Sequence, residues 1–320
     1  MKLLHPIGLV LIATSVLIAG CTRQNKTTAE FAKHNSVYYW KTTFAPDSAE
    51  RAFLAEHDID RIYLHMFDVA VEPDYETGGS EVVPIATTRF EARVPDEIEI
   101  VPVAYITLDA LRAMAGKERK FAPLIVDRLL AMSSYNECGK INEIQLDCDW
   151  TASTRESYAV LCQTVRDSLQ KKEIELSITV RLHQLREPAP PADRGVLMLY
   201  NTGELKGHDT RNSILDIADV KPYMTRKRYP IPLDYAYPVF GWGVKFEREK
   251  FVSIVTEADT VSQPGESVRR ERPAAAEIVA VKKLVESYLG QPASGNLLYH
   301  LDYAQLKHYT HEEIDQILGR

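Results

Sequence analysis

The sequence predicts an α/β protein with a single (β/α)8 barrel of the TIM type over residues 36–320. Eight short strand-like runs recur along the chain, and helical patterns separate most of them. Two consecutive runs, residues 143–151 and 175–183, alternate apolar and polar side chains, whereas buried parallel strands are usually apolar throughout. A chain of 320 residues is long enough for one domain of this size. We therefore expect one barrel in which two neighbouring strands carry polar side chains on the inner face.

The expected strands follow one another at intervals typical of βα units. In order they are residues 37–40, 61–68, 98–106, 143–151, 175–183, 195–201, 233–240 and 296–302. Helical patterns are expected at 47–57, 107–132, 158–169, 274–289 and 310–318. Two long connections remain: residues 70–96 are a long excursion with room for a small hairpin, and the polar residues 244–272 are expected to be a cap or lid loop.

The amino-terminal segment has the pattern of a lipoprotein signal. Lys2 precedes an apolar run from residue 7 to residue 19, which is too short to span a membrane and fits a signal-peptide core. The run ends in Leu-Ile-Ala-Gly-Cys, which resembles a bacterial lipobox. This resemblance implies cleavage before Cys21 and lipidation of its thiol, so the mature protein would be anchored to a membrane without spanning it.

The domain boundaries follow from this pattern. Residues 1–20 are assigned to the signal peptide and residues 21–35, which are polar and aperiodic, to a tether. Thr22, in the place of an aspartate after the cysteine, favours the outer membrane of the bacterial cell envelope. A short buried helix is the alternative for the apolar run.

Composition limits the partners. The net charge of −7 becomes −8 once a leader whose single charge is Lys2 is removed, so a nucleic-acid partner is not expected. The basic clusters at 226–228 and 269–272 are interpreted as solvated loop faces. No glycine-rich nucleotide loop or serine-hydrolase motif is present, and we expect no cofactor.

Three cysteines follow Cys21, and their spacing fits no zinc or redox motif. Cys148 should point from its strand toward the helix that carries Cys162, so packed free thiols are expected there and at Cys138. A Cys148–Cys162 disulfide is the alternative for an extracytoplasmic protein.

Chemistry is expected where the strands end, because active sites of α/β barrels lie at the carboxyl-terminal face. Asp147 and Asp149 lie one pleat apart on the polar face of their strand, and Arg181 of the next strand should lie beside them. Two close carboxylates perturb each other's pKa, which suits an acid/base pair in glycoside hydrolysis. Asp149 is the candidate general acid or base, Asp147 would tune it, and Asp234 or Asp302 is the candidate second carboxylate, with Asp68 also at a strand end.

Aromatic residues near the expected strand ends are candidate platforms for sugar rings. The substrate-binding candidates are Trp40, Tyr200, Tyr237 and Trp242. Aromatic side chains at such positions also serve as core, and the acids with Arg181 also suit a structural ion network. A divalent metal is a further alternative. Asp147 and Asp149 could hold it together with the histidines near strand ends, His65, His183 and His300, but their spacing matches no metal-binding motif.

The strand Ile144-Gln-Leu-Asp-Cys-Asp-Trp150 resembles that of a bacterial family of unknown function. The resemblance extends to Ser153, Arg155 and Tyr158 and to Leu176-Ser-Ile-Thr179, covering residues 140–182. It implies a barrel of the glycoside-hydrolase type and no specific activity. A more distant similarity is to chitinase-type barrels, whose fourth strand ends in Asp-x-x-Asp-x-Asp-x-Glu. Residue 151 is Thr where that pattern has its proton-donating Glu, so chitinase chemistry does not carry over.

These observations predict an envelope lipoprotein whose barrel cleaves or recognises carbohydrate. The alternative is a non-catalytic module that binds a glycan or another envelope protein, or serves as an assembly platform. The absent Glu favours this alternative.

Overall fold

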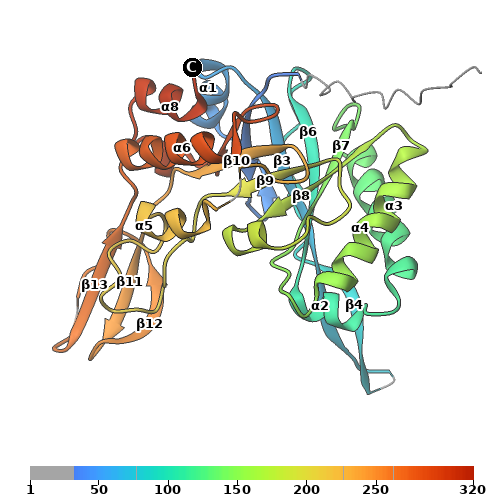
Figure 1. Cartoon of the computed structure of the whole chain (residues 1–320), viewed down its shortest axis with the longest axis horizontal. Coiled ribbons are helices and arrows are strands. Elements are labelled where there is room, and N and C mark those ends of the chain that lie inside the picture. The colour runs from blue at the N-terminus through green and yellow to red at the C-terminus, as the bar shows by residue number, and fades with distance from the viewer. Residues whose placement is uncertain (1–31, 77, 226, 262) are drawn as a thin grey trace, which may run out of the picture. The chain divides into compact units, whose positions relative to one another are not determined.

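The computed structural model describes residues 32–320, apart from residues 77, 226 and 262. Eight parallel strands close into a barrel, because β1 pairs with both β14 and β3. Figure 1 shows them at the centre of the molecule. The predicted (β/α)8 barrel is confirmed. Its strands are β1 (Asn35–Tyr39), β3 (Ile59–Asp74), β6 (Glu99–Ile106), β7 (Glu143–Asp147), β8 (Glu175–Val180), β9 (Arg194–Met198), β10 (Leu233–Pro238) and β14 (Asn296–Tyr299).

Helices follow most of the barrel strands. They are α1 (Ser48–Glu56), α2 (Leu108–Ala113), α3 (Glu118–Tyr135), α4 (Arg155–Gln170), α5 (Ile217–Val220), α6 (Ala275–Leu289), α7 (Tyr303–Leu306) and α8 (His311–Leu318), with short 3-10 turns η1 (Leu182–Arg186) and η2 (Lys221–Tyr223). Among the described residues, no helix is both long enough and apolar enough to cross a membrane. The signal peptide, Cys21 and most of the predicted tether lie outside the described residues.

The excursion after the second barrel strand is a hairpin, as the sequence allowed. β3 continues past the barrel and pairs antiparallel with β4 (Gly79–Ile85), while β5 (Arg89–Phe90) pairs with β2 (Thr43–Phe44). The second long connection differs from the prediction. The expected loop at 244–272 is a three-stranded antiparallel sheet of β11 (Trp242–Glu247), β12 (Lys250–Val255) and β13 (Glu266–Glu271).

Charged residues concealed this sheet in the sequence. Val244 and Phe246 are buried on alternate positions of β11, but the intervening residues and most of β13 are charged. A strand with one solvated face alternates in this way. The predicted loop at 244–272 is therefore wrong: the charged residues that suggested a loop alternate with buried ones along a strand.

Two apolar cores hold the barrel together. One lies between strands and helices and contains Ile144, Leu146 and Cys148 of the β7 segment. The other fills the barrel interior and contains Tyr38, Tyr63, Val101, Val103, Val196, Met198, Tyr200, Ile214, Ala236, Phe240 and Leu297. Cys138, Cys148 and Cys162 are buried free thiols, as expected, and the disulfide alternative is not formed.

Local sequence signals fix the starts of the first and last helices, α1 and α8. Asp47 caps α1 and Thr310 caps α8, each in a capping box with the residue three positions later, Glu50 or Glu313. Such a cap is typically worth about 1 kcal/mol. These two helices begin where the sequence predicted.

Candidate functional site

The polar face of β7 points into the barrel, as the alternation predicted. Gln145 lies deepest, where its side chain accepts a hydrogen bond from the Tyr38 hydroxyl (2.7 Å) and donates one to Ser177 (3.2 Å). One pleat higher, the buried Asp147 accepts a hydrogen bond of 2.6 Å from the Thr179 hydroxyl. Neighbouring strands therefore satisfy both side chains at the centre of the barrel.

Asp149 and Arg181 lie just beyond the ends of their strands. β7 stops at Asp147 and β8 at Val180, which is earlier than predicted. The reason is Gln184 of η1, whose side chain bonds Cys148 O, Trp150 O and Arg181 N and so takes over backbone groups that a longer ladder would pair. The two loops are thereby fixed to each other.

Arg181 binds Asp149 through two hydrogen bonds. Arg181 Nε donates to Oδ1 at 2.5 Å and Nη2 donates to Oδ2 at 3.2 Å, a bidentate geometry. The Asp149 side chain is 37% exposed and that of Arg181 is 22% exposed. The guanidinium carbon also lies 5.7 Å from the centre of the Tyr200 ring. The expectation that Arg181 lies beside the acids is met.

The two aspartates have different environments. Burial raises the pKa of Asp147 to about 6, and the charge of Asp149 adds to this, while the Thr179 hydrogen bond and Arg181 oppose it. The Asp149 side chain is partly exposed and paired with the Arg181 guanidinium. The carboxyl group whose pKa is raised, Asp147, is therefore buried, whereas the accessible Asp149 has an arginine as its partner.

A pocket of about 280 Å³ opens beside this ion pair. Its walls come from the segments that follow β7, β8 and β9 and from η2. They combine charged, hydroxyl, amide and aromatic groups, which is the composition of a small-molecule site. The lining residues are Asp149, Arg181, Leu182, His183, Met198, Tyr200, Asn201, Thr202 and Tyr223.

An aromatic cluster closes the interior beneath the mouth. Tyr299 stacks on Tyr200 with ring centres 4.3 Å apart, and Phe240 meets both rings edge-on. Trp40 lies at the rim, 4.7 Å from the ring of His65, and Trp242 packs on Phe240 and donates to Glu271. Of the predicted platforms, Tyr200 lines the pocket, and Trp40 and Trp242 border the same cluster half-buried.

Two predicted site residues lie elsewhere. Asp234 is the second residue of β10, so its buried carboxylate is at the amino-terminal end of the barrel, where Ser294 N and Gly295 N donate to it. Tyr237 points outward into the core between strands and helices, because Ala236 takes the inner face. Neither residue reaches the mouth. Asp302 caps α7 by accepting from Ala304 N, and no contact joins it to Asp149.

Tyr105 also lies next to the acids, although it was not among the predicted site residues. It lies beside Asp147 in the β6–β7 register, and burial together with the charges of Asp149 and Asp147 raises its pKa to about 12. Val101 and Val103 precede it on the inner face, so the period of two in β6 carried this signal. Asp68 lies across from Tyr105 on β3 and accepts a hydrogen bond from His65 Nε2 at 2.7 Å.

Among the described residues, no group of three or more histidine, cysteine or carboxylate side chains at the mouth is close enough to hold a metal ion. His183 contacts Trp150 O, and burial lowers the pKa of His300 to about 4. Within the described part of the chain, the His and carboxylate groups close enough to share an ion are Glu56, His57 and His311, at a different place in the fold.

Comparison with known proteins relates this fold to solved barrels. No family model and no curated protein matches the sequence. A chitinase from Chromobacterium violaceum has a TM-score of 0.56 at 14% identity, covering 90% of this chain and 100% of its own. The spore cortex-lytic enzyme SleL of Bacillus megaterium has a TM-score of 0.57 at 12% identity, covering 90% and 75%.

A third solved structure is a chitinase-like agglutinin. It comes from Robinia pseudoacacia and has a TM-score of 0.53 at 10% identity, covering 89% of this chain and 99% of its own. At such identities the likeness shows the fold: this chain has the chitinase-like form of the (β/α)8 barrel. That form occurs in the two enzymes and in the agglutinin.

Proposed function

We propose that the chain is a carbohydrate-recognising barrel of the bacterial cell envelope that binds a glycan at its mouth without cleaving it. The pocket beside Asp149 and Arg181 carries the proposal. Its paired carboxylate and guanidinium offer acceptors and donors to sugar hydroxyls, and the half-buried Tyr223 ring adds apolar surface to the wall. The agglutinin among the similar structures is a precedent for a barrel of this form in a protein named for agglutination.

The hydrogen bonds at the mouth and the residue at position 151 argue against hydrolysis. A general acid must carry a proton at the working pH and reach the glycosidic oxygen. Asp149 lines the pocket, but both of its carboxylate oxygens already accept hydrogen bonds from the Arg181 guanidinium. Thr151, where chitinase-type barrels have a Glu, contacts the Ser153 hydroxyl at 3.0 Å and supplies no carboxyl group.

Glycoside hydrolysis remains the second candidate because of one observation. Asp147, with a pKa of about 6, lies one pleat below Asp149 and could supply a proton if a bound glycan drew Arg181 aside. Binding followed by product analysis separates the two functions.

A glycan array identifies ligands, and calorimetry on the hits tests the pocket. Tyr223→Ala removes a half-buried ring from the wall, and we expect binding to weaken roughly fivefold to tenfold. Tyr135→Ala is the matched control, because that ring is 88% exposed on α3 and should leave affinity unchanged. Equal affinity of Tyr223→Ala and wild type would remove the pocket from the proposal.

Mass spectrometry of each bound glycan after prolonged incubation decides the chemistry. Intact glycan at every pH supports recognition alone. Cleavage that Asp149→Asn abolishes would establish the hydrolase in its place, whereas cleavage that survives this substitution would remove Asp149 from the mechanism.

The lipid anchor is part of the same proposal and has its own test. The Leu-Ile-Ala-Gly-Cys ending supports modification at Cys21. Cells fed radiolabelled palmitate should label the wild type and not Cys21→Ser, and the variant should leave the membrane fraction. Equal labelling of both proteins would refute the anchor.

A further inference from the structure

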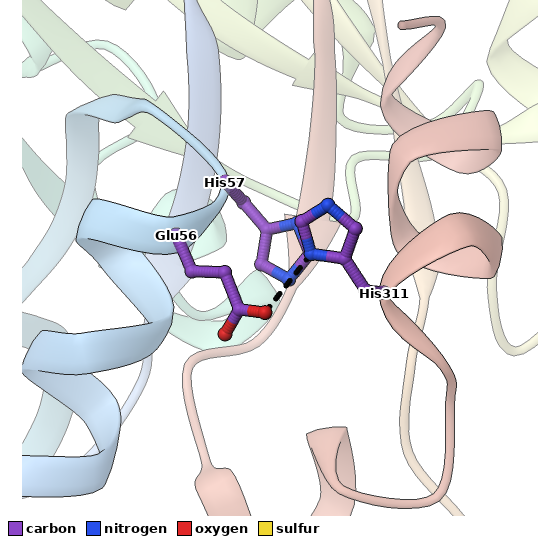
Figure 2. Close-up of side chains that lie close together, drawn as sticks. All are labelled: Glu56, His57 and His311. Atoms are coloured by element: carbon purple, nitrogen blue, oxygen red, sulfur yellow. Dashed lines mark hydrogen bonds and ion pairs between the residues drawn. The ribbon is translucent and has the colours of Figure 1, made fainter.

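Three ligand-type side chains meet at the end of the barrel opposite the mouth. Glu56 is the last residue of α1, His57 caps that helix, and His311 is the first residue of α8. β3 begins two residues after His57, so the cluster lies at the amino-terminal ends of the strands, away from Asp149. Figure 2 shows the two imidazoles stacked with the Glu56 carboxylate at their edge.

The geometry brings their ligand atoms together. One ligand atom from each residue lies within 4.8 Å of the other two. The imidazole centres are 4.6 Å apart with planes inclined by 27°, and Glu56 Oε1 lies 3.0 Å from His311 Nδ1. In a tetrahedral site with bonds of about 2.0–2.1 Å, ligand atoms are roughly 3.3 Å apart. The ligand atoms therefore need to move closer to one another by about 1.5 Å or less, starting from separations of at most 4.8 Å.

A fourth residue orients the rings. Asp315 Oδ1 lies 2.9 Å from His57 Nδ1, and Asp315 Oδ2 lies 3.4 Å from His311 Nε2. An N–H at His57 Nδ1 leaves the lone pair of that imidazole on Nε2. Carboxylates that hold the far N–H of a ligating histidine are the usual outer partners of metal sites, where they fix the tautomer and the ring.

The three side chains differ in their exposure to solvent. The His57 side chain is 3% exposed and packs on Phe53, whose ring centre is 4.5 Å away, so this ligand is fixed in advance. The side chains of His311 and Glu56 are 44% and 56% exposed, so they can adjust and leave a path and a coordination position for water.

We propose that Glu56, His57 and His311 form a site for a divalent transition metal of the Zn²⁺ class, with Asp315 as its orienting carboxylate. Two imidazoles and one carboxylate suit Zn²⁺, whereas Ca²⁺ and Mg²⁺ prefer all-oxygen sites. The ion takes Glu56 Oε1 and the two imidazole lone pairs, and the proton shared by Glu56 and His311 passes to solvent. The metal ties α1 to α8 and so joins the two ends of the barrel domain.

Calorimetric titration of Zn²⁺ into the full-length chain tests the site. The chain carries Cys21→Ser so that this thiol does not bind the metal. We expect one Zn²⁺ per chain and a melting temperature that rises with metal concentration. A wild-type site that takes up no Zn²⁺ overturns the proposal.

Variants assign the ligands. His311→Ala should weaken Zn²⁺ binding at least tenfold, and Asp315→Asn by about 10–100-fold. His208→Ala is the matched control, because its side chain is 42% exposed against 44% for His311 and it lies outside the cluster. Circular dichroism checks folding, and His311→Gln replaces the alanine variant should that one not fold. Unchanged affinity in the His311 variant overturns the assignment.

Cobalt gives a second readout that a purely structural role would not produce. Co²⁺ in a tetrahedral nitrogen and oxygen site absorbs intensely in the visible region, and octahedral aqueous Co²⁺ absorbs weakly. The band should appear with wild type and His208→Ala and be absent with His311→Ala. A spectrum that is the same in wild type and His311→Ala contradicts the site.

Discussion

Carboxylates and arginines form a network at each end of the barrel, and the two networks differ in their access to water. At the amino-terminal end the buried Glu143 lies between two arginines, with Oε2 3.7 Å from Arg61 and 3.5 Å from Arg194. Arg194 also lies 3.8 Å from Asp234 and donates to Ser294, and Tyr63 donates to Glu143. Here the side chains of Glu143, Asp234 and Arg194 are 3%, 2% and 5% exposed.

The mouth has the same residue types in an open setting. Asp149 has one arginine as its partner and a side chain 37% exposed, and the pair lines a pocket. A buried charge loses solvation that only its partners restore, whereas a half-exposed charge keeps water that a ligand can replace. The amino-terminal network is therefore structural, and contacts for a ligand are available at the mouth.

The largest expected effect breaks the amino-terminal network. Arg194→Met leaves the Glu143 and Asp234 carboxylates buried without that cation, and we expect a loss of about 3–5 kcal/mol in the free energy of unfolding. Urea denaturation measures it. Arg155→Met is the control, because the side chains of the Arg155–Glu187 pair are 46% and 29% exposed and the pair should contribute about 1 kcal/mol or less. Equal losses in the two variants would contradict the structural role.

A second prediction concerns the buried acid at the mouth. The pKa of Asp147 is raised to about 6 in the fold, against about 3.9 in the unfolded chain. Between these values the folded protein binds more protons, so this group's contribution falls as pH rises from about 4 to 6 and is constant above. The total is about 3 kcal/mol.

Denaturation of wild type and Asp147→Asn from pH 4 to pH 7 isolates that slope. As pH rises across this interval, the unfolding free energy of the wild type should fall relative to that of Asp147→Asn. A difference independent of pH would mean that Asp147 titrates normally and is not buried as described.

The smallest expected effect on stability is at the open ion pair. Arg181→Met removes the partner of a half-exposed carboxylate, so we expect a loss of about 1 kcal/mol or less, well below that of Arg194→Met. The same denaturation experiment measures it. A loss as large as that of Arg194→Met would show that the mouth is as structural as the opposite end.

Part of the site was predictable because β-strand geometry is local. The alternation in residues 143–151 placed Gln145, Asp147 and Asp149 on one face, and the same period placed Thr179 and Arg181 beside them. Asp234 and Tyr237 were misplaced for two different reasons. Asp234 is near the start of β10, so it lies at the amino-terminal end of the barrel and not at the mouth. Tyr237 points away from the barrel interior because its neighbour Ala236 packs inward.

Local patterns in the sequence were enough to predict the order of strands and helices, the polar inner column of β7 and the place of Arg181 beside Asp147 and Asp149. These rest on contacts within a strand or between consecutive strands. Which end of the barrel is buried and which is open became visible in the three-dimensional structure, and so did the contact of His57 with His311 across 254 positions of sequence. Solvent access and long-range contacts depend on the closed ring of strands and the helices packed around it, and a local pattern of residues carries neither.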